Sequence, residues 1–263
     1  MEIALNNICI KDKLNNFSYV FRESSVTSII GRSGSSKSLI GYVLMNLIKN
    51  YDGKVLVNDL EDYDLYDYLR KVGYVSQDPR FHFICNNVYD EIAYGLRQYK
   101  FKLDKLDNQV ENAIKMVGLD YDILDKDLRC LSSGEAALVA VASAMVMNPD
   151  VLILDEATIF LDSNSKRKLI KLLKLISNKY KKTVIVMSND IDFVYDLGGD
   201  YILLDKGNIV AIDKVSNIIS NYDLFKKKGM EIPKIVEFIK YVENRKGIKL
   251  SDVGDINDIC KEV

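Results

Sequence analysis

The chain has 263 residues, of which 48% are hydrophobic and 28% charged, and this composition excludes a disordered or low-complexity protein. Its 36 lysines and arginines are nearly balanced by 38 aspartates and glutamates, so we expect no broad cationic surface and no nucleic-acid partner. The four cysteines form no CxxC pair, and we expect the single histidine, His82, to have a packing role, so no zinc site is predicted. No apolar run reaches the ~20 residues that a membrane-spanning helix needs.

Strands and helices alternate along much of the predicted fold. Residues 26–30 are an apolar run that predicts a buried strand ended by Gly31, and apolar residues at helical spacing between Leu39 and Ile48 predict the next helix. Because several later runs are also continuously apolar, we expect a mostly parallel sheet covered on both faces, which is an α/β fold. Those further strands are predicted at residues 54–57, 72–76, 151–155, 183–188 and 201–205, with a helix at 164–180.

Two segments interrupt this alternation and are predicted to be helical. In the first, an apolar helix face is closed by Gly118, and a long apolar helix follows Gly134. In the second, Pro233 opens a helix that Gly247 ends. The predicted organisation is a first half of the core at 1–85, a helical subdomain at 86–147, a second half of the core at 148–215 and a C-terminal helical extension at 216–263.

A glycine-rich loop lies between the strand at 26–30 and the helix after it. Backbone N–H groups in such a loop, together with the positive end of the helix dipole, hold polyphosphate. Lys37 would reach the β- and γ-phosphates, and the Ser38 hydroxyl would ligate Mg²⁺. The alternative is a tight turn with a solvated lysine, which the flanking strand and helix disfavour. The loop consists of Gly31, Arg32, Ser33, Gly34, Ser35, Ser36, Lys37 and Ser38.

Two adjacent acids end the apolar strand at residues 151–155. Ligands of open α/β sheets bind at the carboxyl ends of the strands, where these side chains emerge. Asp155 would hold magnesium through its water shell, and Glu156 is placed to polarise an attacking water. The alternative, two solvated acids at a strand end, is disfavoured by the phosphate-type loop earlier in the chain.

A second anion site is suggested where the long apolar helix begins. Ser132 and the exposed N–H groups around Gly134 could bind an anion at this helix N-terminus. The alternative is that Ser132 simply caps the helix, with Glu135 in its first turn. For this segment by itself, capping is the better interpretation.

Together these motifs resemble those of ABC-type ATPases, the nucleotide-binding subunits of transporters. Residues 31–38 are similar to the Walker A motif, 151–156 to Walker B and 131–135 to the family signature. Gln77 is similar to the glutamine of the Q-loop, and residues 161–162 to the D-loop. The resemblance implies a P-loop NTPase core with bound ATP and Mg²⁺. It places Glu156, Gln77 and Asn189 in catalysis, and Ser38, Gln77 and Asp155 at the magnesium ion.

A narrower resemblance is to the ATPases of energy-coupling factor (ECF) transporters, which import vitamins and transition-metal ions. Residues 77–95 resemble their Q-loop region, and residues 224–247 resemble their C-terminal extension. The resemblance implies a peripheral protein on the cytoplasmic face of the cell membrane that couples ATP hydrolysis to uptake. Its partners would be a second ATPase subunit and an integral membrane subunit, which would be contacted near residues 81–94. Two ATPase subunits would pair head to tail, with Ser132 and Gly134 of one completing the ATP site of the other.

Three departures from the family pattern concern this chain's own ATP site. Asn189 stands where the family has a histidine, and an amide can donate a hydrogen bond but cannot carry a proton or a positive charge. Ser36 replaces the glycine before Lys37, and its Cβ would crowd the phosphate or restrict the backbone. No aromatic residue occupies positions 9–12, where relatives stack a ring on adenine. We therefore expect slow hydrolysis at this site and a non-identical partner subunit.

Two other functions fit parts of the same pattern. A nucleotide-binding regulatory subunit with little hydrolysis is favoured by Asn189, but Lys37, Asp155 and Glu156 argue against it. A soluble ABC ATPase that acts in DNA repair or on ribosomes is disfavoured by the short helical segment and the acidic net charge of −2.

Overall fold

The computed structural model describes residues 1–78, 80, 83–99 and 105–246. The expected packing role of His82, the start of the segment expected to contact a membrane subunit and the helix end at Gly247 lie outside these residues. No helix within the described ranges is long and apolar enough to cross a membrane.

A small antiparallel sheet contains the N-terminus of the chain. Its strand order is β2-β1-β4, and β1 pairs with both neighbours in antiparallel register. Of its three strands, the sequence pattern predicted only β4. The strands are β1 (Ile3–Ile10), β2 (Leu14–Phe21) and β4 (Asp52–Val57).

The larger sheet has the strand order β5-β6-β7-β3-β8-β9. All neighbouring pairs are parallel except β8 with β9, so the prediction of a mostly parallel sheet is confirmed. The order places β7 between β6 and β3, so the carboxyl ends of these three strands meet at one edge. The strands are β3 (Val26–Ile30), β5 (Val72–Val75), β6 (Val151–Asp155), β7 (Thr183–Ser188), β8 (Asp200–Asp205) and β9 (Asn208–Lys214).

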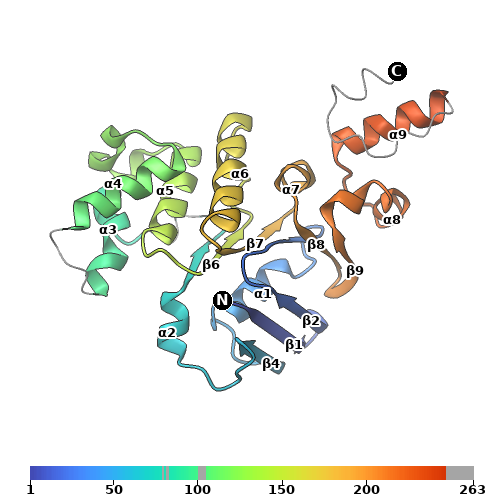
Figure 1. Cartoon of the computed structure of the whole chain (residues 1–263), viewed down its shortest axis with the longest axis horizontal. Coiled ribbons are helices and arrows are strands. Elements are labelled where there is room, and N and C mark those ends of the chain that lie inside the picture. Colours follow the sequence, from blue (N-terminus) through green and yellow to red (C-terminus); the bar gives the residue numbers. More distant parts are fainter. Residues whose placement is uncertain (79, 81–82, 100–104, 247–263) are drawn as a thin grey trace.

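Helices cover the large sheet and extend beyond it. Figure 1 shows α3, α4 and α5 grouped on one side of the molecule and α8 and α9 at the opposite end. The α-helices are α1 (Lys37–Leu44), α2 (Leu65–Arg70), α3 (Val88–Gln98), α4 (Leu106–Val117), α5 (Ser133–Met145), α6 (Ser163–Asn178), α7 (Ile191–Leu197), α8 (Tyr222–Lys227) and α9 (Lys234–Lys246). Short 3₁₀ segments lie at η3 (Tyr121–Asp125), η4 (Leu128–Cys130) and η5 (Val215–Ile218).

Strand β6 shows why continuously apolar strands occur here. Its side chains alternate between two hydrophobic cores, since successive residues of a strand point to opposite faces. Leu152 and Leu154 pack with residues of α3, α4, α5 and α6. Val151 and Ile153 pack with α1 and the small sheet. Both faces of β6 are therefore buried, as the sequence predicted.

The predicted ends of the inserted helices agree closely with the structure. Helix α4 ends at Val117, and Gly118 takes the left-handed conformation at φ 76°, which closes the helix as glycine commonly does. Helix α5 begins at Ser133, so Gly134 lies in its first turn rather than before it.

Candidate functional site

The glycine-rich loop runs from the end of β3 into α1. Gly31 must be a glycine, because a Cβ there would lie 2.3 Å from the carbonyl oxygen of Leu204. Ser36 is the N-cap of α1 and lies in the left-handed region at φ 78°, which a residue with a Cβ adopts at a cost of about 1–2 kcal/mol. Its hydroxyl donates a hydrogen bond of 2.6 Å to the carbonyl oxygen of Lys13. This bond ties the loop to the turn between β1 and β2 and helps hold Ser36 in its strained conformation.

Lys37 is the buried cation of the site. Its Nζ donates to the carbonyl oxygen of Gly31 at 2.6 Å and to Oδ1 of Asn189 at 2.5 Å. Oε1 of Glu156 lies 3.4 Å from the same Nζ, and both side chains are less than 8% exposed. Burial lowers the pKa of the Lys37 ammonium, and the neighbouring Glu156 carboxylate opposes this shift.

The two acids that follow β6 point to the same edge of the sheet. Oδ1 of Asp155 accepts a hydrogen bond from Oγ of Ser38 at 3.1 Å, and Oδ2 accepts one from the Tyr74 hydroxyl at 3.1 Å. Oε2 of Glu156 accepts the backbone N–H of Asn189 at 3.0 Å. Burial raises the pKa of both carboxyls, and these hydrogen bonds oppose the shift.

A cavity of about 230 Å³ lies at the carboxyl edge of β3, β6 and β7, and Asp155 is connected to it through the hydrogen bond from Ser38 rather than lining it. Gln77, which follows β5, lines the same cavity. Gly31 and Arg32 line instead an adjoining cavity of about 600 Å³, which also includes Asp190 and Gly229. The other lining residues of the first cavity are Ser33, Gly34, Ser35, Ser36, Lys37, Ser38, Leu39, Glu156 and Asn189.

The donor groups at this edge suit a hard divalent cation. Ser38 and Asp155 present oxygen atoms 3.1 Å apart, and Gln77, whose side chain carries an amide oxygen, lines the cavity together with Ser38. Oxygen ligands of this kind, next to a phosphate-type loop, are those that Mg²⁺ uses in nucleotide sites. The residues present therefore fit a magnesium ion accompanied by a polyphosphate.

Comparison with known proteins identifies the family of the chain. The ABC transporter model matches residues 14–159. The energy-coupling factor transporter ATP-binding protein EcfA of Malacoplasma penetrans is 30% identical over 259 residues, which are 96% of this chain and 89% of that protein. The chain belongs to the ABC transporter family.

Solved structures of the family have the same fold. The structure of cbiO1 from Clostridium perfringens, part of the ABC transporter complex cbiONQ, gives a TM-score of 0.75 at 26% identity and covers 90% of this chain and 98% of that one. A dimeric ATP-binding cassette bound to ADP and Pi gives a TM-score of 0.73 at 26% identity, with 81% and 98% covered. The predicted ABC ATPase fold is thereby confirmed.

The signature segment of this family member lies apart from its own phosphate loop. The Ser132 hydroxyl accepts the N–H of Glu135 at 3.2 Å, and the Glu135 carboxylate accepts the N–H of Ser132 at 2.8 Å. This reciprocal pair is a capping box that starts α5. Neither Ser132 nor Gly134 lines the cavity at Lys37. The capping interpretation of Ser132 is thus correct for the single chain, and a role toward a partner's nucleotide stays a prediction.

Sequence reasoning missed Tyr74, which contacts Asp155 from the neighbouring strand β5. The sequence contains only a weak indication that Tyr74 lies near the site. Tyr74 lies three residues before Gln77, on a strand that parallel pairing sets beside β6, with Tyr74 opposite Ile153.

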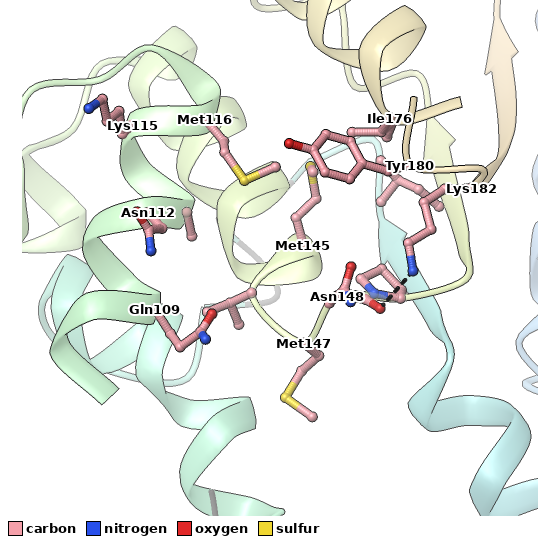
Figure 2. Close-up of a pocket in the computed structure, with 14 residues that line it drawn as sticks. Gln109, Asn112, Lys115, Met116, Met145, Met147, Asn148, Ile176, Tyr180 and Lys182 are labelled. Atoms are coloured by element: carbon pink, nitrogen blue, oxygen red, sulfur yellow. Dashed lines mark hydrogen bonds between the residues drawn. The ribbon is translucent and has the colours of Figure 1, made fainter. Parts of the chain in front are cut away.

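Another cavity of this ABC family member lies away from the nucleotide site. It measures about 660 Å³ and is formed by α4, the end of α5 and α6. Figure 2 shows Met116, Met145 and Tyr180 around it, and Lys182 donating a hydrogen bond to the carbonyl oxygen of Asn148. It shares no lining residue with the cavity at Lys37.

Proposed function

We propose that this chain is the ATP-binding subunit of an ECF-type ABC importer, which couples Mg-ATP binding and hydrolysis to uptake of a vitamin or a metal ion. The observation that carries the proposal is that Lys37, Ser38 and Glu156 line one cavity, with Asp155 hydrogen-bonded to Ser38. A tight turn with a solvated lysine would not bury Lys37, whose side chain is 6% exposed, against the Glu156 carboxylate and the Asn189 amide. The name of the Malacoplasma penetrans relative supports the transporter class.

Different residues at the site bind the phosphates and the magnesium ion. The loop from Gly31 to Ser38 holds the phosphates with its backbone N–H groups and with Lys37. Ser38, Gln77 and Asp155 hold Mg²⁺, which supplies positive charge at the β- and γ-phosphate oxygens when bound. Because Nζ of Lys37 is bonded to Asn189 and paired with Glu156, a γ-phosphate must compete with these two groups for the ammonium.

Catalytic roles fall to three residues near the γ-phosphate position. Glu156 polarises the attacking water, since its carboxylate is held by the N–H of Asn189. Gln77 links the water and the metal to the adjoining loop. Asn189 donates a hydrogen bond to a γ-phosphate oxygen in place of a charged donor. Loss of a positioned charged donor to a transferring phosphoryl group typically lowers the rate by roughly 10²–10³, so we propose slow hydrolysis at this site.

A second ATPase subunit completes the active unit. Ser132 and Gly134 lie outside the cavity of their own chain, so they serve the nucleotide of a partner. The dimeric cassette bound to ADP and Pi supports such pairing in a related protein. Slow hydrolysis at Asn189 favours a non-identical partner whose own motifs are intact. An integral membrane subunit anchors the pair at the cytoplasmic face of the membrane.

We also propose the division of labour along the chain that the sequence suggested. Segments 1–85 and 148–215 form the nucleotide-binding core, and segment 86–147 carries the signature helix to the partner. Segment 216–263 is an added C-terminal extension.

The experiment measures ATP turnover of the purified chain alone and after mixing with a partner ATPase that has intact motifs. The proposal expects slow turnover alone and a large increase in the mixture, which the Ser132→Ala variant of this chain would reduce. Rapid turnover by the isolated chain, abolished by Glu156→Gln, would contradict the slow-site proposal. Recovery of the chain from cell extracts with an integral membrane protein tests the transporter class.

Asn189 also favours one alternative function, a regulatory subunit that binds nucleotide and scarcely hydrolyses it. This alternative predicts that the ATP turnover of the partner changes when nucleotide binds at Lys37. It also predicts that the Glu156→Gln substitution in this chain leaves that turnover unchanged.

A further inference from the structure

Tyr74 contacts Asp155, the acid that is also hydrogen-bonded to Ser38 of the phosphate loop. It lies in β5, next to β6, and its hydroxyl donates a hydrogen bond of 3.1 Å to Oδ2 of Asp155. Asp155 is 1% exposed, so few partners are available to its carboxylate. The other oxygen of Asp155 accepts a hydrogen bond from Ser38 at 3.1 Å. Each carboxylate oxygen thus has a donor from a different element.

The ring of Tyr74 is held in place by the helix that follows the phosphate loop. A Cβ on Gly41 of α1 would lie 3.2 Å from Cε2 of Tyr74, so the helix backbone passes close to the ring. The ring of Tyr42, on the same helix, packs against it with centroids 6.4 Å apart at 55°. The half-buried ring is thus contacted by two residues of α1, which favour the position from which its hydroxyl donates to Asp155.

The torsion that rotates a carboxylate of aspartate is soft, so one hydrogen bond leaves its plane poorly defined. Two donors, one on each oxygen, define it. Ser38 itself belongs to the magnesium site under the proposed function, so Tyr74 is the fixed donor that stands outside the set of ligands. Groups in this position orient metal ligands and commonly change metal affinity or activity by about 10–100-fold when removed.

We propose that Tyr74 is a positioning residue that orients the Asp155 carboxylate for magnesium and so sets how strongly Mg²⁺ tightens nucleotide binding. This inference rests on the proposed function, because it assumes that a magnesium-nucleotide complex binds beside Asp155. It assigns Tyr74 no contact with the nucleotide or with the reacting atoms.

The test uses the whole chain and a fluorescent, nonhydrolysable ATP analogue. The dissociation constant of the analogue is measured in EDTA and over a series of Mg²⁺ concentrations. For Tyr74→Phe we expect the affinity in EDTA to stay within about twofold of the wild type, and the Mg²⁺ concentration for half-maximal tightening to rise about tenfold or more.

A matched control is Tyr68→Phe. Tyr68 is buried whereas Tyr74 is half-buried, and the Tyr68 hydroxyl donates to the carbonyl oxygen of Leu44 at 2.6 Å rather than to the metal site. We expect this variant to lose some stability and to keep the Mg²⁺ dependence of the wild type. A loss of affinity in Tyr74→Phe that is equal in EDTA and in Mg²⁺ would overturn the assignment, because it would indicate a general structural role.

A double-mutant cycle tests whether Tyr74 acts through Asp155. In an Asp155→Asn background, removal of the Tyr74 hydroxyl should change the Mg²⁺ dependence less than twofold, since coupled residues are non-additive. A full tenfold effect in that background would overturn the assignment. If the wild type binds the analogue with no Mg²⁺ dependence at all, the proposed function fails as well. A wild type with strong Mg²⁺ dependence and an unchanged Tyr74→Phe variant would refute this inference alone.

Discussion

Asn189 contacts both the cation and the second acid of the nucleotide site. Its side-chain oxygen accepts a hydrogen bond of 2.5 Å from Nζ of Lys37, and its backbone N–H donates one of 3.0 Å to Glu156. The residue at the family's histidine position is therefore fixed beside Lys37 and Glu156. The amide is bonded through its oxygen, so its NH₂ group is the part that can face a phosphate.

Replacement of Asn189 by histidine should increase the hydrolysis rate. An imidazole restores a donor that can carry positive charge toward the transferring phosphate, and we expect the turnover number to rise by roughly 10²-fold. The measurement is steady-state phosphate release by the Asn189→His variant, alone and with the partner ATPase. Affinity for a nonhydrolysable analogue, measured in parallel, should change little. Unchanged turnover in a well-folded variant would argue that Asn189 does not limit the rate.

The backbone conformation of Ser36 should determine how much each substitution there changes the stability of the protein. Ser36→Gly relieves the left-handed strain but loses the hydrogen bond to Lys13, so we expect stability within about 1 kcal/mol of the wild type. Ser36→Ala loses the bond and keeps the strain, and should destabilise by about 1 kcal/mol. Urea unfolding of the three proteins checks the order. An alanine variant more stable than the glycine variant would contradict it.

Loss of the Ser132 cap should affect the fold and leave the chain's own nucleotide site intact. Ser132→Ala removes the acceptor for the N–H of Glu135 and should cost about 1 kcal/mol in the free energy of unfolding. Because Ser132 lies outside the cavity at Lys37, nucleotide affinity of the isolated chain should be unchanged. Denaturant unfolding and a binding titration give both values, and a large loss of affinity in the isolated chain would contradict the geometry.

The capping box also predicts a pH dependence of stability. Hydrogen bonds from Ser132, and then Lys126, hold the pKa of the Glu135 carboxyl below its usual value. A carboxyl whose folded pKa is lowered stabilises the fold above its unfolded pKa of about 4.3, and this contribution disappears as the pH falls through the folded value. The stability difference between wild type and Glu135→Gln should therefore be constant from pH 8 to about 5 and shrink below about 4. A difference that grows on acidification would show the opposite sign of shift.

The sequence predicted the strands of the large sheet well, except the edge strand β9, and those of the small sheet poorly. Strands β3, β6 and β7 are buried on both faces, so continuous apolar runs reveal them. Strand β1 is harder to recognise, because register shifts lie on both sides of Ile8 and Asn7 has a positive φ of 54°, which breaks the alternation of apolar residues.

Local motifs also predicted most of the candidate site, since the loop at Lys37 and the acids after β6 are each continuous in sequence. Contacts between segments could not be predicted in this way. The Tyr74 hydrogen bond to Asp155 depends on β5 lying beside β6, and the Ser36 bond to Lys13 depends on how the small sheet meets the loop. The first follows from strand order and the second from the packing of the two sheets, and a single sequence leaves both open.

The most direct test of the account is nucleotide binding by Lys37→Ala, measured by titration of a nonhydrolysable ATP analogue with Mg²⁺. Lys54→Ala is the matched control, because Lys54 pairs with Glu61 on an exposed surface of the small sheet. The account predicts that Lys37→Ala loses most of the affinity, at least about tenfold, while Lys54→Ala keeps it. A Lys37→Ala protein that is folded and binds the analogue as tightly as the wild type would contradict the central claim that Lys37 holds the phosphates beside Asp155 and Glu156.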